Sequence, residues 1–545
     1  MKQLLSAIFL FGTISMVLAQ KPTKETTHFD VFVGPQEKRE LGTTVGSFIG
    51  GDQEAFFTHF SKGKEVMYAK YGYDLKRKNK NEIVRPKEKV LWNSEFHMEI
   101  GDQIYEFYSI SDKKAKTNKL YCRTIDKDKL APNKDETEIF VLKGDAFYKN
   151  FANAFTQVDI SPDGSKFLVT LKLPEEKDRY RRFRFMVFDR QFKLLWEQTH
   201  KFYINKDKVF KVVNRDWVSA GGGNFFFRMG NTGSYNAFNI NNEGEVLTWG
   251  VQDKGRDYDA MRRFETYVFR ITESDVKSAQ VGFKEKRILS TSIGWSPDGK
   301  VMISGFYNDN PKTKYNLIDG AYLSYWDIET GEPSHISYDS FSEEFKTQYW
   351  SERKVKKYEK EKSKGKDRVG MDLFYLDHTI TKADGGVILV GERFYTYYQR
   401  VGKMQIKKYV HGNIVVINVD PQGNILWSKK IPKHQDSSNP SSVGYSFAHT
   451  ADKLYFLYND NFKNIAADWD GSKVYTFVTG DNPVVMAVCD MENDGEITRE
   501  QAWTTDDAGG MFLNDDKVAQ LFDDEVVVYI QGGKGTQRLI RLELK

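Results

Sequence analysis

Short apolar runs alternate with turn signals along most of the chain. Two of these runs follow the same four letters: Ser-Pro-Asp-Gly at 161–164 precedes KFLVTL, and the copy at 296–299 precedes KVMISGF. Proline presets the backbone for the second position of a β-turn, aspartate bonds to nearby amides, and glycine adopts the left-handed conformation. Apolar runs this short, bounded by turns, are typical of strands buried on both faces. The pattern predicts an all-β chain.

A hairpin pattern follows these turns. In each copy an apolar strand ends at Asp or Asn, a tight turn follows, and a second strand begins. The clearest copies are FMVFDRQFKLLWEQ (185–198), YLSYWDIETGEPSHIS (322–337) and VVINVDPQGNILWSKK (415–430), with weaker copies at 236–250 and 484–498. Their uneven spacing indicates loop insertions in a common unit. We infer that each unit holds four strands, as two hairpins in series.

Four-stranded units arranged radially form a β-propeller, which leaves only short sheet edges exposed. The SPDG turns followed by V-x-D-x-x-G-x-x-x-W hairpins resemble the TolB-like and quinoprotein-like propellers of exported bacterial proteins. The resemblance spans most of the chain after residue 20. It implies a fold, because its motifs are structural and are shared by proteins of many functions.

The sequence predicts eight blades, with seven as the alternative. The tail from Met511 offers three strands, and the segment HFDVFVG at 28–34 would supply a fourth. Joining the two termini in one blade would close the ring and remove its last open edges. A single propeller domain over 20–545 follows. The other units are expected to begin near Val45, Phe96, Val158, Asp216, Ile293, His378 and Tyr445.

The segment 340–368 departs from the strand pattern. It is charged and poor in β-branched residues, and Ser340 with Glu343 forms the capping-box signature of a helix start. Three aromatic residues recur on one helical face: Phe341, Phe345 and Tyr349. We predict a helical insertion between blades, which either faces solvent or serves as a docking arm for a partner.

Residues 1–19 have the three parts of an export signal. Lys2 supplies the positive charge, 4–18 the apolar core, and Val17-Leu18-Ala19 a small-residue cleavage site before Gln20. The alternative, a membrane anchor, is disfavoured because the core is too short to span a bilayer. No later run approaches the ~20 apolar residues of a spanning helix, so no transmembrane segment is expected. We expect an exported protein of the periplasm, free there or associated with the outer membrane.

Composition narrows the function classes further. The chain has 80 basic and 76 acidic residues and a formal net charge of +4, so no global field favours nucleic acid. Aromatic residues make up 14% of the chain against only 13 prolines, which favours folded strands. Cys122 and Cys489 fall in separate units of the ring, whereas a disulfide needs Cα atoms within roughly 7 Å. We predict two buried thiols.

Several segments resemble functional motifs, but each lacks residues that the motif requires. The segment 490–501 resembles an EF-hand calcium loop, but Glu492 and Gln501 stand where other ligands belong, which indicates a hairpin turn. QGGKGTQ at 531–537 lacks the Gly-Lys-Ser/Thr order of a phosphate loop. The histidines lack zinc spacing, and there is no Gly-x-Ser-x-Gly elbow. We predict no metal, no cofactor and no catalytic residue, and leave open a dyad assembled from separate blades.

Two polar stretches and a tyrosine cluster are the candidate partner-binding residues. The polar loop 431–446 follows a strand, and LYNDNFKN at 457–464 is rich in Asn and Asp, although turn chemistry also explains that richness. The tyrosines follow GGVILVGERF, where they either pack on neighbouring strands or line a binding rim. The candidates are Lys433, Gln435, Asn459, Asp460, Asn461, Asn464, Tyr395, Tyr397 and Tyr398. If the polar residues contact a partner, alanine at these positions leaves the melting temperature nearly unchanged.

These stretches are similar to segments of propeller proteins exported by Bacteroidetes, a group without an assigned activity. The resemblance implies a non-catalytic subunit on the periplasmic side of an outer-membrane assembly, such as a protein-secretion channel or nutrient importer. The expected partner is an outer-membrane barrel or its lipoproteins, bound by a monomer within a hetero-complex. The alternative is a glycan- or peptide-acting hydrolase, marked by carboxylates or a metal converging in the central funnel.

Overall fold

The computed structural model consists largely of antiparallel β-sheet. It describes residues 21–38, 47–52, 54–62, 65–84, 91–144, 155–173, 181–202, 210–212, 238–253, 264–281, 286–310, 317–365, 371–471, 473–477, 482–509, 513, 518–531 and 535–545. The expected export signal at 1–19 lies outside these ranges. So do the unit starts expected near Val45 and Asp216.

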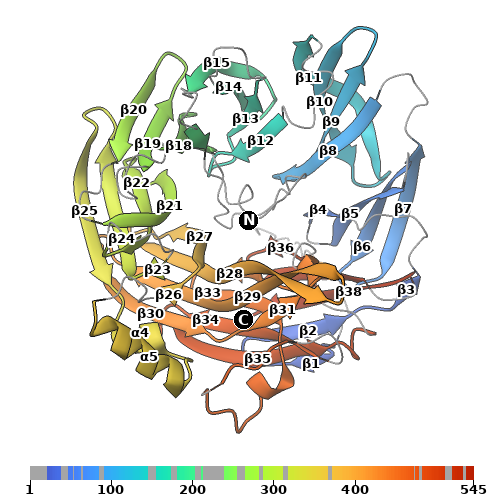
Figure 1. The fold of residues 1–545 in the computed structure, drawn as a ribbon. Coiled ribbons are helices and arrows are strands. Elements are labelled where there is room, and N and C mark those ends of the chain that lie inside the picture. The colour runs from blue at the N-terminus through green and yellow to red at the C-terminus, as the bar shows by residue number, and fades with distance from the viewer. Residues whose placement is uncertain are drawn as a thin grey trace, which may run out of the picture.

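Eight sheets of four to six strands account for most of the described residues, and they succeed one another in chain order around a common centre (Figure 1). The first three sheets comprise β4 (Ser47–Gly51), β5 (Ala55–Lys62), β6 (Glu65–Gly72) and β7 (Arg77–Val84); β8 (Leu91–Ile100), β9 (Gln103–Asp112), β10 (Thr117–Asp126) and β11 (Ala131–Lys143); and β12 (Phe155–Ile160), β13 (Lys166–Lys172), β14 (Arg181–Asp189) and β15 (Leu194–Phe202). The fourth and fifth comprise β16 (Phe210–Val212), β17 (Phe238–Ile240), β18 (Val246–Asp253), β19 (Phe264–Ile271) and β20 (Val276–Val281); and β21 (Arg287–Trp295), β22 (Val301–Asn308), β24 (Gly320–Asp327) and β25 (Glu332–Ser340).

The remaining sheets follow the same order. The sixth and seventh comprise β27 (Phe374–Thr381), β28 (Val387–Val401), β29 (Met404–Val419), β30 (Ile425–Ile431) and β31 (Gln435–Ser437); and β32 (Ser446–His449), β33 (Lys453–Asn459), β34 (Pro483–Asp490) and β35 (Glu496–Thr504). The eighth comprises β36 (Val518–Phe522), β37 (Glu525–Gln531), β38 (Thr536–Leu544), β1 (Lys24–Glu25), β2 (Phe29–Val33) and β3 (Glu37–Lys38). A small extra sheet pairs β23 (Leu317–Ile318) with β26 (Met371–Asp372). This radial arrangement of mostly four-stranded antiparallel sheets is that of a β-propeller.

The eighth sheet combines the first three described strands with the last three. Its strand β2 pairs antiparallel with β38, in a register that places Phe29 opposite Leu544 and Val33 opposite Ile540. Phe29 is fully buried in the apolar cluster between the seventh and eighth sheets. The segment 28–34 therefore occupies the position in the C-terminal sheet that its apolar alternation favours.

The SPDG turns form as predicted. Gly164 and Gly299 have φ values of 65° and 79°, and each donates its amide to the carbonyl of the serine three residues earlier. The first turn joins β12 to β13 and the second joins β21 to β22. All eight residues of β22 are buried, as expected for a strand covered on both faces. The rejected calcium loop is likewise a hairpin turn, between β34 and β35.

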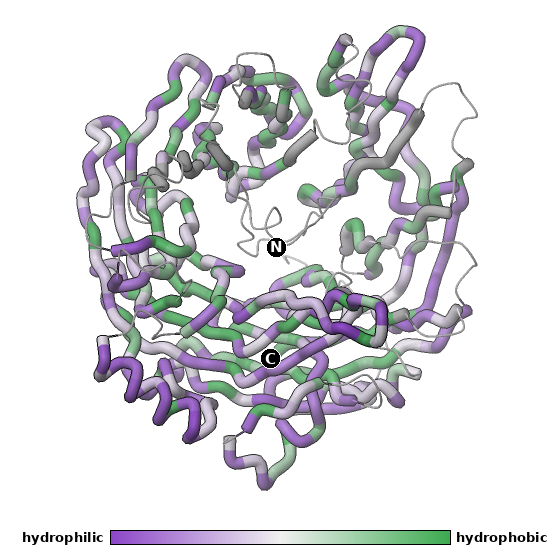
Figure 2. Tube along the Cα trace, in the orientation of Figure 1, coloured by the Kyte–Doolittle hydropathy of each residue, from purple (hydrophilic) through white to green (hydrophobic). Residues whose placement is uncertain are grey.

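Apolar clusters of buried side chains join each sheet to the next. Figure 2 shows the hydrophobic positions, in green, along the strands that contribute to them. The cluster of the second and third sheets contains Cys122, and that of the sixth and seventh contains Cys489. Both cysteines are buried free thiols. Burial raises the pKa of both thiols, which keeps them protonated and unreactive.

The insertion after the fifth sheet contains two helices, α4 (Glu343–Thr347) and α5 (Glu352–Lys362). The capping box expected at Ser340 is wrong by two residues, because Ser340 still pairs with Gly320 in the β24–β25 ladder. Ser342 caps the helix instead, and its hydroxyl accepts a hydrogen bond from the amide of Phe345 at 3.1 Å. No helix in the described part of the chain has the length and apolarity needed to cross a membrane.

Lys430 fastens this insertion to the sixth sheet. Its buried ammonium donates to the carbonyl of Phe345 at 2.6 Å, and the carbonyls of Lys346 and Gln348 lie at 3.5 Å. These carbonyls end α4, where backbone dipoles favour a cation. Burial lowers the pKa of Lys430 to about 7, with a smaller contribution from Lys354. The short helix α4 therefore depends on a side chain from a strand far along the chain.

Replacing Lys430 by Met is expected to loosen the insertion, because the carbonyls at the end of α4 lose their donor while the methionine retains the packing volume. Tryptic cleavage within 352–364 under native conditions, followed by mass spectrometry, should accelerate several-fold. Lys429→Met is the matched control, because Lys429 is the neighbouring, partly exposed lysine. Equal cleavage rates in the two variants would contradict the anchoring role.

Candidate functional site

The sixth sheet carries most of the candidate residues and has two unusually long strands. β28 and β29 have 15 and 16 residues, whereas their neighbours β27 and β30 have 8 and 7. The outer parts of β28 and β29 form a two-stranded hairpin, residues 394–411, which we call the arm (Figure 1). Its turn places Gly402, with φ of 61°, at the first of two loop residues, where tight hairpins prefer glycine.

A buried polar network lies at the base of the arm. The Lys433 ammonium donates to Glu392 Oε1 at 2.6 Å and to Gln435 Oε1 at 2.8 Å. The other oxygen of Glu392 lies 2.7 Å from His411 Nδ1. Gln435 then donates to the backbone carbonyl of Asn459 at 2.7 Å. The network therefore ties β28 and β29 to β31 and to the end of β33.

The Glu392–Lys433 ion pair is excluded from water. The side chains are 2% and 0% exposed. Burial opposes ionisation of Glu392, but His411 and Lys433 outweigh it and hold the pKa of this carboxyl well below its usual range. A buried pair of this kind is costly to break from one side, because the remaining partner keeps its charge without compensation.

The Asn- and Asp-rich stretch orders the loop that follows β33. Asp460 Oδ1 accepts from the Asn461 amide at 2.8 Å and from Asn464 Nδ2 at 2.7 Å. Asn464 also bonds both backbone groups of Tyr475, and Asn461 bonds the carbonyl of Thr476. Asn459 is buried as well, where it bonds both backbone groups of Leu513 and the carbonyl of Ser442. The turn chemistry considered from the sequence is therefore present.

Asp460 differs from its neighbours in having an unsatisfied oxygen. Its Oδ2 atom is buried and has no hydrogen-bond partner among the described residues. Burial raises the pKa of Asp460 to about 6, against the opposing hydrogen bonds from Asn464 and the Asn461 amide. The side chain is therefore poised to take up a proton in mildly acidic solution.

The tyrosines lie on the arm and increase in exposure toward its tip. Tyr395 is half-buried, Tyr397 is 37% exposed and Tyr398 is 66% exposed. Tyr397 donates to Asp436 Oδ2 at 2.8 Å, which links the arm to β31 beside the buried network. The guanidinium of Arg393 lies over the ring of Tyr395, with its Cζ atom 4.9 Å from the ring centroid.

The structure thus brings the predicted residues into one region and divides them by depth. The buried group, out of reach of a partner, comprises Lys433, Gln435, Asn459, Asp460 and Asn464. Tyr397, Tyr398 and the partly buried Tyr395 and Asn461 form the outer group. Binding of a partner in this region stays a prediction, with the buried group acting as its support.

Two members of the network, Glu392 and His411, were not singled out from the sequence. Glu392 follows Ile388 and Val390 at every second position of a strand, which places it on the same covered face. A carboxylate at such a position indicates a buried partner of opposite charge. The alternation was readable in VILVGE, but the partner at position 433 lies beyond any local pattern.

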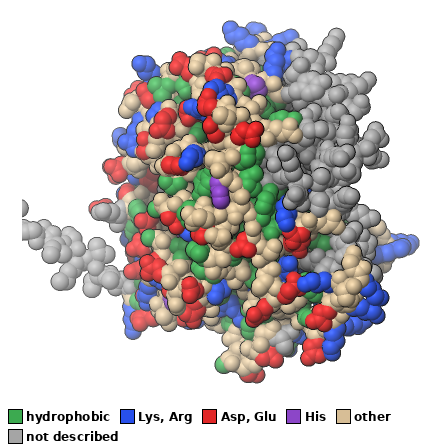
Figure 3. Space-filling model, turned by 90° about the vertical axis from the view of Figure 1, so that its left-hand side faces the viewer, with side chains coloured by type: hydrophobic (Ala, Val, Ile, Leu, Met, Phe, Trp, Pro, Cys, Tyr) green, Lys and Arg blue, Asp and Glu red, His purple; other side chains and the backbone are tan. Residues whose placement is uncertain are grey.

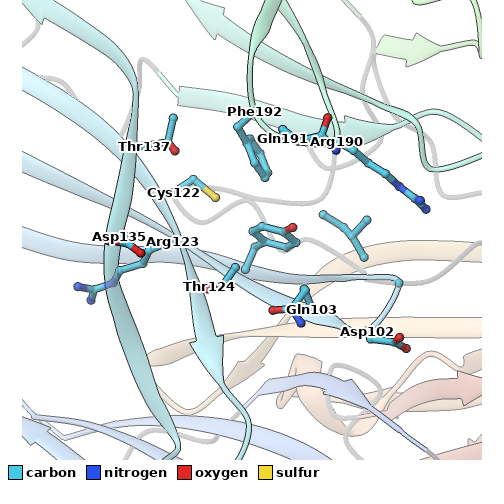
Figure 4. Close-up of a pocket in the computed structure, with 13 residues that line it drawn as sticks. Asp102, Gln103, Cys122, Arg123, Thr124, Asp135, Thr137, Arg190, Gln191 and Phe192 are labelled. Atoms are coloured by element: carbon cyan, nitrogen blue, oxygen red, sulfur yellow. The ribbon is translucent and has the colours of Figure 1, made fainter.

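A pocket of about 610 Å³ opens elsewhere, between the second and third sheets (Figure 4). Its lining includes Asp102, Cys122, Arg123, Asp135, Arg190 and Phe192. Arg123 is already bound to Glu106, at 2.8 Å, and the raised pKa of Cys122 disfavours a thiolate. Within the described residues, no three His, Cys, Asp or Glu side chains group so that they could hold a metal ion.

Replacing Lys433 by Met is expected to lower the free energy of unfolding by about 3–5 kcal/mol, because Glu392 is left buried without its cation. Urea denaturation measures this change. Adding Glu392→Gln to that variant should restore part of the loss, since a neutral amide costs less to bury.

The matched control is Lys463→Met, at an exposed lysine on the neighbouring loop, which should shift the unfolding free energy by no more than about 0.5 kcal/mol. A Lys433→Met variant as stable as this control would contradict the structural role and favour the direct-contact interpretation of Lys433.

Replacing Asp460 by Asn should stabilise the protein at neutral pH. The folded-state pKa of about 6 exceeds the ordinary 3.8, so the native state holds this proton more tightly than the unfolded state does. Native stability contributed by Asp460 is therefore present at low pH and is lost as pH rises from about 4 to about 6. The advantage of Asp460→Asn should grow over that window to roughly 2–3 kcal/mol. Unfolding curves that show a pH-independent difference would contradict it.

Among known proteins, the chain matches only solved structures, by similarity of fold. No protein family and no curated protein matches the chain. The chain is similar to prolyl oligopeptidase B from Galerina marginata, with 10% identity, a TM-score of 0.38, and coverage of 92% of this chain and 55% of that one. It is also similar to an oligogalacturonate lyase in complex with manganese, with 9% identity, a TM-score of 0.34, and coverage of 94% and 98%. A third similar structure is the β-propeller domain of the Trilobed protease from Pyrococcus furiosus, with 9% identity, a TM-score of 0.33, and coverage of 86% and 97%. Likeness at these values carries no argument about activity.

Proposed function

We propose that the chain is an exported, non-catalytic binding propeller that serves as a periplasmic accessory or plug subunit of an outer-membrane assembly, such as a protein-secretion channel. The observation that carries the proposal is the arm, a projection with exposed large side chains on a fixed base. Tyr398 and Met404 are each 66% exposed, while Lys433 beneath them is fully buried. Exposed anchors held by a rigid scaffold are typical of binding sites.

The proposed ring has eight blades and is closed by its own termini. The pairing of β2 with β38 supports this closure. A further support is the apolar cluster that joins the eighth sheet to the first, in which Phe32 and Val527 lie with Phe56. A ring without open edges suits a subunit that must resist strand exchange with neighbouring chains.

The proposed partner is an outer-membrane barrel or its lipoproteins, bound by one copy of the chain in the periplasm of a Bacteroidetes-type bacterium. The export signal expected at 1–19 supports this location. Acidic and basic side chains lie interspersed on the side that carries β25 and the helices (Figure 3). Such a surface has no broad basic field, which agrees with a partner other than nucleic acid.

The test is affinity purification from the native host. The chain is tagged after Lys545 through a flexible linker, the envelope is extracted with mild detergent, and co-purifying chains are identified by mass spectrometry. An exported protein with the same tag controls for carry-over. A stoichiometric outer-membrane barrel is the expected result. Recovery of the chain alone would overturn the accessory-subunit proposal.

A further inference from the structure

The arm has a tip of unusual composition. Residues 394–411 contain four lysines and arginines and no Asp or Glu, whereas the whole chain is nearly balanced in charge. The ammonium of Lys408 lies 3.6 Å from Asp436 Oδ1, so the carboxylate compensates one of the four positive charges. The remaining three, Arg400, Lys403 and Lys407, lie at or near the tip, and none of them forms an ion pair with a described residue. The tip is therefore locally basic.

An exposed apolar pair lies at the end of the arm, next to the two turn residues Gly402 and Lys403. Val401 and Met404 face each other across the last strand pair before the turn, and they are 46% and 66% exposed. The next pair inward is Arg400 with Gln405. Among the other exposed large apolar residues, Leu426 lies on β30 of the same sheet but outside the arm, and Phe522 lies on β36 of the eighth sheet. The exposed apolar pair is therefore flanked by cations, with Lys403 in the turn beyond it and Arg400 and Lys407 behind it.

The arm stands free of the sheet on both sides. β31 pairs with β29 only at residues 409–411, and β30 pairs with β29 from Ile414 onward. No described strand pairs with 404–408 on the side away from β28. An isolated two-stranded hairpin is marginally stable in water. The Tyr397–Asp436 hydrogen bond and the buried network therefore hold the base of a projection whose tip is left to solvent.

We propose that the tip of the arm docks on an anionic lipid surface, with Val401 and Met404 entering the headgroup region and the three cations pairing with lipid phosphates. This inference deepens the proposed function and rests on it only for the placement of the chain in the envelope. Tyr398 lies three residues behind Val401, or about 10 Å at the usual rise of a strand. Interfacial elements bury their apolar side about 5–10 Å deep, and tyrosine is enriched at that level.

A lipid surface fits this order of residues better than an acidic protein does. A protein partner that adds a strand to an edge bonds backbone groups and selects side chains along one face. Here Val401 and Met404 instead form the last strand pair, next to the turn, where they would face solvent beside such a partner. Lysine and arginine near an anionic leaflet each strengthen attachment about fivefold, so three cations and two apolar residues form a reversible anchor.

The test is co-sedimentation of the full-length mature chain with vesicles. Vesicles of equal parts phosphatidylglycerol and phosphatidylcholine should bind the protein, vesicles of phosphatidylcholine alone should not, and added salt should weaken binding. The variant Arg400→Gln/Lys403→Gln/Lys407→Gln should lose at least tenfold in partition. The pair Val401→Ser/Met404→Ser should lose several-fold while salt sensitivity remains.

The matched control removes three exposed lysines from α5, as Lys356→Gln/Lys357→Gln/Lys360→Gln, with the same change in net charge. It should bind like the unmodified protein. Melting temperatures establish that all variants fold. Equal binding by the arm and α5 variants would overturn the proposal, since it would indicate attraction by net charge alone.

Two further outcomes separate the lipid from a protein. Failure of the unmodified chain to bind the anionic vesicles overturns the lipid proposal. If, in addition, the arm variant loses its co-purifying chain, the arm docks on an acidic protein instead. Conversely, vesicle binding by a chain that purifies from the host without a barrel would overturn the proposed function and support the lipid-docking arm.

Discussion

Apolar packing between consecutive sheets is the interaction on which the rest of this structure depends. Each cluster draws its members from two neighbouring sheets, so no sheet has a complete core by itself. A sheet with two apolar faces is stable only when both are covered. The first and last sheets meet the same requirement through Phe32 and Phe56, which belong to opposite ends of the ring order. The first described strands and the last ones therefore take part in the core.

This packing explains how an arm can project from one sheet. The inner halves of β28 and β29 are buried between neighbouring sheets, so their register is strongly specified. The ion pair of Glu392 and Lys433 lies where that buried part ends. Burying two charges is expensive, and a hydrophobic pair of similar volume often serves stability equally well. Here the pair belongs to a hydrogen-bonded network that joins β28, β29, β31 and the end of β33 at the base of the arm, which fixes where the outer hairpin leaves the sheet.

The electrostatic character of the protein changes with depth. Inside, the charged group of Glu392 is paired with His411 and Lys433, and that of Lys430 is hydrogen-bonded to backbone carbonyls, because an uncompensated buried charge is costly. On the side that carries β25 and the helices, both signs are interspersed (Figure 3). The tip of the arm is the exception, with Arg400, Lys403 and Lys407 beside exposed apolar residues. A composition that serves neither packing nor charge balance within the chain is typical of a surface made for another molecule.

Local chemistry in the sequence determined the strands, the SPDG turns and the apolar tail that pairs with residues 28–34, because turn residues and alternation act over a few neighbours. It also indicated a helical insertion. The helix begins later than predicted, because Ser340 still pairs with Gly320 in the β24–β25 ladder. Only the tertiary structure decided that Lys433 and Asp460 are buried and that Tyr398 is exposed. Polar loop residues carry no periodic signal of burial, since what covers them comes from strands tens of residues away. Depth, and with it the division between buried and exposed candidates, is a property of the assembled sheets.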